Sequence, residues 1–334
     1  MLRTFPNQNF SNRSFSLDPL PHEKQIHEYI KTIEHLKKQN QNNPLFSKEI
    51  KNLEQKLEVL KQKVYSELTP WQRVMISRHP SRPHSIDYIK KMCSQFIELF
   101  GDRVHGDDPS VVGGLAVIAG MRYVIIGQEK GFDTESRVFR NFGMLNPEGF
   151  RKSLRLMRLA EKFDLPVISL LDTPGANVLL EAEERGQGLA IAQNLREMAR
   201  LAAPIIIIII GEGFSGGALG NGIGDVVGML EHACYTVISP EGCASILWKD
   251  ADKKAEAAAA LKLNSENLLE LGVIDSIIAE PLGGAHHNPE KMIEQVKQFI
   301  LDQTNILKNI PKELLLEQRY LKFRKMGEFL EGAI

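Results

Sequence analysis

The spacing of apolar residues predicts a helical hairpin in the first part of the chain. Two stretches within residues 22–67 repeat apolar side chains at intervals of three and four, and the turn-forming sequence NQNNP at 40–44 separates them. In the second stretch the repeat consists of Ile50, Leu53, Leu57, Leu60 and Val64. This spacing is the seam of a coiled coil, so we expect two helices that pack on each other and leave an outer edge free.

From residue 111 onward the pattern changes to short apolar runs that alternate with amphipathic stretches. The runs predict strands at 111–118, 121–127, 167–171, 205–210 and 234–239 and near Val273. The amphipathic stretches predict helices from Pro147 and over 182–201, 251–262, 288–302 and 311–325. Before them, we expect a connector at 68–83 that marks a domain boundary, and a helix from a cap at Ser85 through Phe100. The alternation of strands and helices predicts an α/β fold with mainly parallel pairing.

The longest apolar run consists of six isoleucines at 205–210, and a glycine-rich sequence follows it. An unbroken run of β-branched residues is apolar on both faces, which is typical of a parallel strand covered by helices on each side. The sequence Ser-Gly-Gly-Ala-Leu at 215–219 is expected to open a helix after a glycine-rich turn. The N–H groups at a helix start can hold an anion, so this junction is the candidate site.

Composition and charge narrow the class of protein. The 334 residues are 43% hydrophobic and 25% charged with a net charge of −1, so we expect a globular protein that binds neither nucleic acid nor a membrane surface. The three cysteines form no CxxC pair, so we expect no metal site and reduced thiols. No apolar run reaches the roughly 20 residues of a membrane span. We expect a cytoplasmic protein with a disordered N-terminus at 1–20.

The glycine-rich sequence fits two side-chain-dependent motifs. Gly211, Gly213 and Gly216 match the dinucleotide fingerprint, but the acidic residue that this motif needs after the next strand is missing. Ser215 matches the nucleophile elbow of a serine hydrolase, with Asp275 and His286 following in the required order. Ser215 equally fits an N-cap of its helix.

A third interpretation needs no reactive side chain. The backbone amides of Gly216, Gly217 and Ala218 could form an oxyanion hole, because glycine lets a ligand approach the backbone closely. A separate candidate is the row of cations on the helix from Pro147. These cations either grip a phosphorylated ligand or form a solvated face, and they are Arg151, Lys152, Arg155 and Arg158.

A long series of motifs carries a family resemblance. They are LTPWQR (68–73), RHPSRP (78–83), GDR (101–103), NFGM (141–144), PEGFRK (147–152), DTPGA (172–176), AEERGQ (182–187), SGGAL (215–219), SPEGCASILWK (239–249) and EPLGGAH (280–286). By their joint order the chain resembles the carboxyltransferase alpha-subunit family of bacterial and plastid-type acetyl-coenzyme A carboxylases, within the crotonase-like superfamily. The resemblance implies a crotonase-like spiral of ββα units with an N-terminal helical hairpin.

The resemblance also implies an activity. The family transfers a carboxyl group from carboxybiotin, held on a biotin carboxyl carrier protein, to acetyl-coenzyme A, giving malonyl-coenzyme A for fatty acid synthesis. Both are substrates, and no covalently bound cofactor is expected. The implied partners are a zinc-ribbon beta subunit in an α2β2 assembly, the carrier protein and biotin carboxylase, within an ATP-dependent complex. Activity is expected only with the beta subunit.

The resemblance assigns roles to residues of this chain. It implies the oxyanion hole at Gly216, Gly217 and Ala218, and the coenzyme A substrate is expected to meet Arg151 and Arg155. The residues Asp172, Thr173, Pro174 and Gly175 are expected to shape the pocket floor, and the alternative is that they form only a turn at a strand end. The implied domains are the N-terminus (1–20), the helical hairpin (21–67), the crotonase-like carboxyltransferase domain (68–310) and the C-terminal helix (311–334).

Two positions depart from the family pattern. The segment Asn177-Val178-Leu179-Leu180-Glu181 replaces a turn that usually holds an aromatic residue, proline and glycine, and Phe214 replaces a small residue. Leucine adopts a positive φ only at a cost, and a ring at 214 either narrows the pocket or packs away from it. These departures motivate the alternative of a non-catalytic assembly partner.

Overall fold

The computed structural model describes residues 19–40 and 46–327, and the structural statements below concern those residues. The expected disorder at 1–20 falls almost entirely outside them, and so does most of the expected turn at 40–44. Within the described residues no helix is long and apolar enough to cross a membrane.

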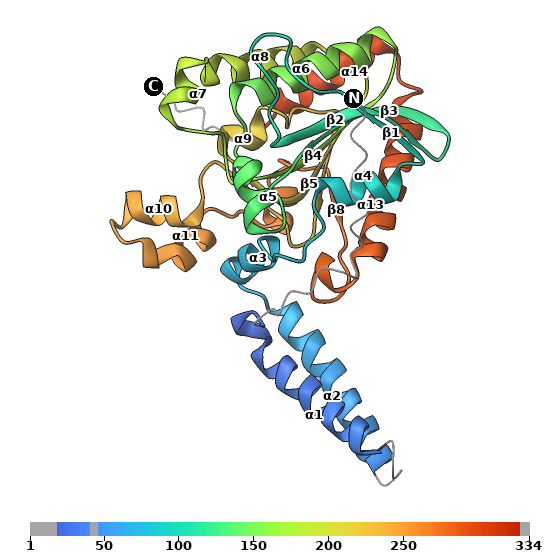
Figure 1. Ribbon diagram of the computed structural model, residues 1–334, viewed down its shortest axis with the longest axis vertical. Coiled ribbons are helices and arrows are strands. Elements are labelled where there is room, and N and C mark those ends of the chain that lie inside the picture. Colours follow the sequence, from blue (N-terminus) through green and yellow to red (C-terminus); the bar gives the residue numbers. More distant parts are fainter. Residues whose placement is uncertain (1–18, 41–45, 328–334) are drawn as a thin grey trace, which may run out of the picture.

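A mixed sheet forms the centre of the fold (Figure 1). Its strands run in the order β1-β2-β3-β4-β5-β6-β8, and β7 pairs with the far end of β5. The strands are β1 (Gln95–Glu98), β2 (Val111–Ile118), β3 (Met121–Gln128), β4 (Val167–Thr173), β5 (Ile205–Phe214), β6 (Val226–Leu230), β7 (Cys234–Thr236) and β8 (Ser276–Ile278). The pairs β1–β2 and β2–β3 are antiparallel, and every pair from β3 to β8 is parallel. The expected α/β fold with mainly parallel strands is confirmed.

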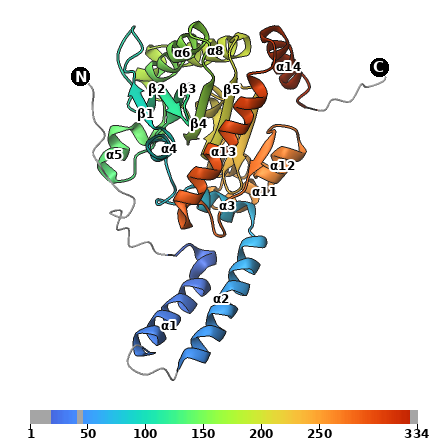
Figure 2. The same ribbon diagram turned by 90° about the vertical axis from the view of Figure 1, so that its right-hand side faces the viewer.

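Helices cover both faces of this sheet, which explains why β4 and β5 are buried along their whole length. Figure 2 shows α4 and α13 lying together on one face, while α6 and α8 lie together on the other. The longer helices are α1 (Lys24–Asn40), α2 (Ser47–Ser66), α3 (Pro70–Ser77), α4 (Ser85–Met92), α6 (Pro147–Lys162), α8 (Gln187–Arg200), α10 (Pro240–Leu247), α13 (Pro289–Leu307) and α14 (Lys312–Arg324). The shorter ones are α5 (Thr134–Phe139), α7 (Leu180–Glu184), α9 (Ser215–Leu219), α11 (Lys254–Ala260) and α12 (Ser265–Glu270). Short 3₁₀ turns lie at η2 (Pro21–Glu23), η4 (Asn141–Gly143), η5 (Ala251–Lys253) and η6 (Ala285–His287).

The helices α1 and α2 lie side by side and extend away from the α/β body (Figure 1). At the end nearest the body, their apolar side chains join a small cluster built on Ile26, Tyr65, Leu68 and Ile76. Farther out, an exposed ion pair joins Lys37 to Glu54 at 2.7 Å. The hairpin therefore contacts the body mainly at its base, through residues of α1, α2 and α3. The expected domain limits at 68 and 310 stay a prediction.

The prediction of one helix over 85–100 is wrong. The helix α4 ends at Met92, and β1 then pairs with β2 in antiparallel register. Its N-cap position belongs to His84, because the Ser85 hydroxyl instead donates to the carbonyl of Gln128 at 2.7 Å. The apolar spacing at 89–99 suits a helix as well as a strand, and the free edge of β2 decides between them.

The connector at 68–83 is not an open linker. Thr69 caps α3 by accepting a hydrogen bond from the Gln72 amide, and Val74 and Ile76 are fully buried. The strand β6 and the helices α10 and α12 were not predicted. The expected glycine-rich turn at 211–214 is also wrong, since β5 continues unbroken to Phe214.

Candidate active site at the end of β5

The candidate site lies where β5 passes directly into α9. Phe214 occupies the N-cap position without a side-chain cap, so the expected cap role of Ser215 is wrong. Ser215 is exposed and has a φ of 55°, a left-handed conformation at the bend between strand and helix. Gly216 is half-buried, whereas Gly217 and Ala218 are buried. The first N–H groups of a helix have no acceptor within it, so the amides of these residues remain available.

The turn after β4 packs against the start of α9. A Cβ added to Gly217 would lie 2.3 Å from the carbonyl carbon of Gly175, so only glycine permits this approach. The Gln128 side chain links the same two segments. Its amide donates to the Gly217 carbonyl at 2.7 Å, and its oxygen accepts from the Asp172 N–H at 3.1 Å. The structure therefore brings together Gly217 and the turn from Asp172 to Gly175.

The turn itself is held by Thr173. Its hydroxyl oxygen lies 2.6 Å from the carbonyl oxygen of Gly143 and 2.8 Å from that of Gly175. Gly175 has a φ of 149°, and Pro174 is exposed. The four residues of the turn are thus fixed by neighbouring backbone, and Asp172 and Pro174 face a cavity.

A buried charge network, formed by Arg78, Lys130, Asp172 and Glu212, lies beneath this turn. The Lys130 ammonium is 2.6 Å from both carboxylates, and Arg78 Nε is 2.6 Å from Glu212. Burial lowers the pKa of Lys130, but the two carboxylates outweigh it and raise that pKa overall. Burial likewise raises the pKa of Glu212, and the two cations outweigh it, so that pKa is lowered. The network is charged and internally paired.

This network explains a glycine in the strand. A Cβ at Gly211 would lie 2.3 Å from Asp172 Oδ1, the atom that accepts the Glu212 N–H at 2.9 Å. Gly211 therefore accommodates a buried carboxylate and does not form a turn.

A cavity of about 260 Å³ opens beside the network. Its walls combine cations, carboxylates and one aromatic ring, and they are Ser77, Arg78, His79, Arg82, His84, Lys130, Arg137, Phe142, Asp172, Pro174 and Glu212. In the described part of the chain, Arg78, Arg82, His84 and Lys130 pair with carboxylates and His79 accepts from the Ser81 N–H. For the Arg137 side chain, no hydrogen bond or ion pair with the described residues is found. Arg137 is thus the side chain best suited to meet an anion here.

Arg151 and Arg155 lie on α6 and do not line that cavity. The Arg151 Nε donates to Asp102 at 2.7 Å, and its terminal nitrogens reach Glu148 and the Arg185 carbonyl. Arg155 donates to three carbonyl oxygens of the segment 99–101. Both guanidinium groups therefore hold neighbouring segments, and their expected contact with coenzyme A stays a prediction.

The hydrolase triad is not assembled among the described residues. His286 stacks on His79 with ring centroids 3.8 Å apart. Asp275 accepts from the Val227 N–H at 2.7 Å and pairs with Lys322. Ser215 contacts neither of them, so the structure removes the reason for the hydrolase interpretation.

The two departures from the family pattern leave the cavity open. Phe214 is fully buried in a separate apolar cluster with Val74, Cys234 and Leu263, and it does not line the cavity. The segment 177–181 has no residue with positive φ. Asn177 anchors it, accepting from the Leu179 N–H at 3.0 Å and donating to Asn146 at 2.8 Å.

Several residues of this site were missed by sequence reasoning. Arg78, Lys130, Arg137 and Glu212 carry the charge around the cavity, and His84 is paired with Glu129 at 3.2 Å. Arg78 stands in the quoted motif RHPSRP, and Glu212 follows the isoleucine run, so both were visible as polar residues next to candidate elements. Their pairing depends on contacts between distant segments.

Comparison with solved structures defines the class of fold. Transcarboxylase 12S, in a crystal structure with hydrolysed methylmalonyl-coenzyme A bound, superimposes with a TM-score of 0.56 at 17% identity, over 70% of this chain and 44% of that one. The beta subunit of Pseudomonas aeruginosa geranyl-CoA carboxylase gives 0.53 at 15% identity, over 74% of this chain and 46% of that one. The fold is that of the crotonase-like carboxyltransferases.

The sequence comparison identifies the family. The family model for acetyl co-enzyme A carboxylase carboxyltransferase-like proteins matches residues 19–327, and the chain belongs to this family. It is 72% identical over 316 residues to the acetyl-coenzyme A carboxylase carboxyl transferase subunit alpha of Protochlamydia amoebophila, covering 95% of this chain and 100% of that protein. The protein of the same name from Chlamydia trachomatis is 60% identical over 312 residues, covering 93% and 96%.

Proposed function

We propose that the chain is the alpha subunit of an acetyl-coenzyme A carboxylase carboxyltransferase. The observation that carries this proposal is the 72% identity over the full length of a relative with that name. The expected motifs also lie together in space, since DTPGA and SGGAL meet through Gly175 and Gly217. The reaction would carry a carboxyl group from carboxybiotin to acetyl-coenzyme A and give malonyl-coenzyme A.

The reaction depends on stabilising the negative charge that develops on the ureido oxygen. It does not need a side chain of the protein as a base. Cleavage of the bond between the ureido nitrogen and the carboxyl carbon releases carbon dioxide and leaves an electron pair, and hence negative charge, on the ureido group. The resulting anion removes a proton from the methyl group of acetyl-coenzyme A. The enolate carbon then forms a bond to carbon dioxide. Fixed N–H donors aimed at the ureido oxygen would lower the barrier of the first step.

We assign those donors to the amides of Gly216, Gly217 and Ala218. Three features support the assignment: the amides begin a helix, they lie beside the Asp172–Gly175 turn, and Gln128 braces both segments. The buried charge network holds the turn from below through Asp172. Because these contacts fix the donors in place, the site need not reorganise during the reaction. Electrostatic stabilisation of a transition state depends on such preorganised donors.

The cavity beside the turn is the proposed approach for the substrate's anionic group. The Arg137 side chain is half-buried at the wall and would meet that group, while Asp172 and Pro174 shape the floor. Arg137→Ala should therefore raise KM with little change in stability. A matched control is Arg158→Ala, which removes a cation outside the cavity.

The proposed partners follow from the relatives' name and the family's chemistry. A beta subunit would supply the second half of the site, in an α2β2 assembly. A biotin carboxyl carrier protein would present carboxybiotin, and a biotin carboxylase would regenerate it. We place the complex in the cytoplasm.

Reconstitution tests the proposal. The full chain is mixed with a beta-type subunit, and malonyl-coenzyme A decarboxylation is measured with free biotin as the carboxyl acceptor. We expect turnover only when both subunits are present, and we expect Ser215→Ala to retain it. A stable complex without turnover would assign the chain to the non-catalytic alternative.

A second assay addresses the cations of α6. The double alanine variant should lower the melting temperature in either case, because both residues hold the segments at 99–102 and 185. If coenzyme A also meets Arg151 and Arg155, the variant raises KM for malonyl-coenzyme A; if it does not, KM is unchanged.

A further inference from the structure

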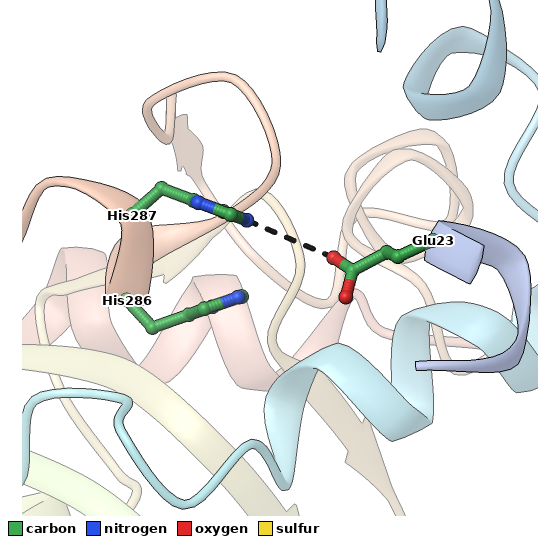
Figure 3. Close-up of side chains that lie close together, drawn as sticks. All are labelled: Glu23, His286 and His287. Carbon is green, nitrogen blue, oxygen red and sulfur yellow. Dashed lines mark ion pairs between the residues drawn. The ribbon is translucent and has the colours of Figure 1, made fainter. Parts of the chain in front are cut away.

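A group of histidines lies where the helical hairpin joins the body, and one of them, His79, also lines the cavity of the site at the end of β5. Its core consists of Glu23 from η2 and the consecutive His286 and His287 from η6. Figure 3 shows both rings directed toward the Glu23 carboxylate. One ligand atom from each of the three lies within 4.8 Å of the other two, and Glu23 Oε1 is 3.7 Å from His287 Nε2. With His79, which stacks on His286, we call this group the histidine cluster.

We propose that Glu23, His286 and His287 bind a divalent transition-metal ion such as Zn²⁺, which fastens the start of the hairpin to the body. Two imidazoles and one carboxylate are the donor set that suits zinc and its neighbours in the first transition row. The ion would draw the three ligand atoms closer than the 4.8 Å limit within which they now lie. A fourth position would remain for water from the adjoining cavity.

The protonation states suit metal binding. Burial lowers the pKa of His286, and the nearby rings of His79 and His287 lower it further, so this imidazole is neutral at pH 7. Burial raises the pKa of Glu23, but hydrogen bonds with His287 and Tyr65 outweigh it, so that pKa is lowered and the carboxylate is ionised. A metal ion would therefore displace no proton from His286 or Glu23.

The cluster also holds polar atoms that its internal contacts do not satisfy. Among the described residues, the Nδ1 atom of His286 is buried and has no hydrogen-bond partner. An unpartnered buried polar atom costs stability, and stacked neutral rings do not compensate it. Tyr65, by contrast, donates to Glu23 Oε1 at 2.9 Å and orients the carboxylate, as outer groups commonly do around metal ligands.

The preceding glycines explain how two consecutive histidines reach one point. Gly283 and Gly284 have φ values of 93° and 116°, which side-chain-bearing residues rarely adopt. A Cβ at Gly283 would lie 2.5 Å from His287 Cδ2 and 2.9 Å from Tyr65 Cζ. The sequence Gly-Gly-Ala-His at 283–286 thus has a geometric role here, one that the carboxyl-transfer site does not use.

Access to the cluster is open. A cavity of about 260 Å³ is lined by Glu23, His79, His286 and His287 together with Tyr65 and residues of α1. The side chain of His287 is 46% exposed, so an ion can enter without unfolding the junction. The segments η2 and η6 are far apart in the sequence. The bound ion would therefore link the start of the hairpin directly to the body.

The test uses the full chain, stripped with a chelator and desalted, and titrated with Zn²⁺ against a chromophoric competitor. We expect one equivalent bound per chain, with affinity reduced tenfold or more in Glu23→Gln and in His287→Gln. The matched control is His35→Gln, because His35 is exposed on α1 and its ring bonds to Gln39 at 3.0 Å. Control binding should equal that of the wild type.

Two further readouts separate the site from a structural effect. Excess Zn²⁺ should raise the melting temperature of the wild type and of His35→Gln but not of His287→Gln. Co²⁺ should give visible absorption bands that His287→Gln lacks. The proposal is overturned if the stripped wild type binds no stoichiometric Zn²⁺, or if all variants bind it equally. His287 is exposed enough that its substitution leaves a folded chain to measure, and circular dichroism checks this.

Discussion

The buried charge network and the histidine cluster both place polar groups inside the molecule, but they are built in opposite ways. In the network, Lys130 and Arg78 pair with Asp172 and Glu212 at 2.6 Å, and these contacts raise the pKa of Lys130 and lower that of Glu212. In the cluster, His286 is neutral, and one of its buried nitrogens has no partner among residues 19–40 and 46–327. The network is complete without a ligand and serves to position the turn above it. The cluster is incomplete, which is why we infer a ligand there and not in the network.

The largest expected effect comes from breaking the network. Lys130→Met leaves two carboxylates buried without their shared cation, and we expect a loss of about 3–5 kcal/mol of unfolding free energy. Urea denaturation monitored by circular dichroism measures it. Lys37→Met is the control, because the pair of Lys37 and Glu54 is exposed and its loss should cost less than about 1 kcal/mol. Equal losses in both variants would contradict the positioning role of the network.

The next largest effect is expected from Gly217, where α9 packs against the turn that the network positions. Gly217→Ala pushes α9 away from Gly175, because its Cβ would lie 2.3 Å from that residue's carbonyl carbon. We expect decarboxylation by the reconstituted complex to fall by about 100-fold, as small displacements of a catalytic group commonly do. Gly188→Ala is the matched control, since nothing lies within 4 Å of a Cβ at that position in α8. The control should retain full activity and gain up to about 1 kcal/mol of stability.

The buried histidines His84 and His286 differ in the direction of their pKa shifts. Burial lowers the pKa of His84, but the hydrogen bond and charge of Glu129 outweigh it and raise that pKa overall. A histidine with a raised folded-state pKa stabilises the protein below the unfolded value of 6.5, and this contribution is lost as the pH rises through the folded value. The urea midpoint should therefore fall as the pH rises above the unfolded value of 6.5, and His84→Gln should flatten this slope. An identical slope in the variant would show that the His84–Glu129 pair is not the cause.

The smallest effect is expected on the outer face of α6. Arg158 is 59% exposed and lies 3.4 Å from Glu197, so Arg158→Ala should change stability by less than about 0.5 kcal/mol. Arg151→Ala should cost about 2 kcal/mol, because it removes a charged hydrogen bond from the buried Asp102 carboxylate. Thermal unfolding of the two variants gives the difference. A large loss of stability in Arg158→Ala would contradict the expectation that the exposed side chains of this helix face contribute little to stability.

The sequence allowed much of the fold to be predicted because the decisive patterns are local. The isoleucine run could only be a strand buried on both faces, and the helices from Pro147 and over 288–302 followed from their apolar spacing. The strands expected at 111–118 and 121–127 are β2 and β3, which Ala119 and Gly120 separate with φ values of 48° and 81°. The ordered motifs carried the family resemblance, which the comparisons confirm.

Other features were decided only by the tertiary structure. The segment 95–98 became a strand because β2 offered a free edge, and Gly211 is required because the carboxylate of Asp172 occupies the space beside it. Lys130 and Glu212 are polar residues of no evident pattern, and their meaning comes from segments that fold against each other. Likewise, nothing in the sequence near Glu23 points to His287. Local spacing sets the elements, whereas the pairing of distant polar groups depends on burial, which only the assembled fold defines.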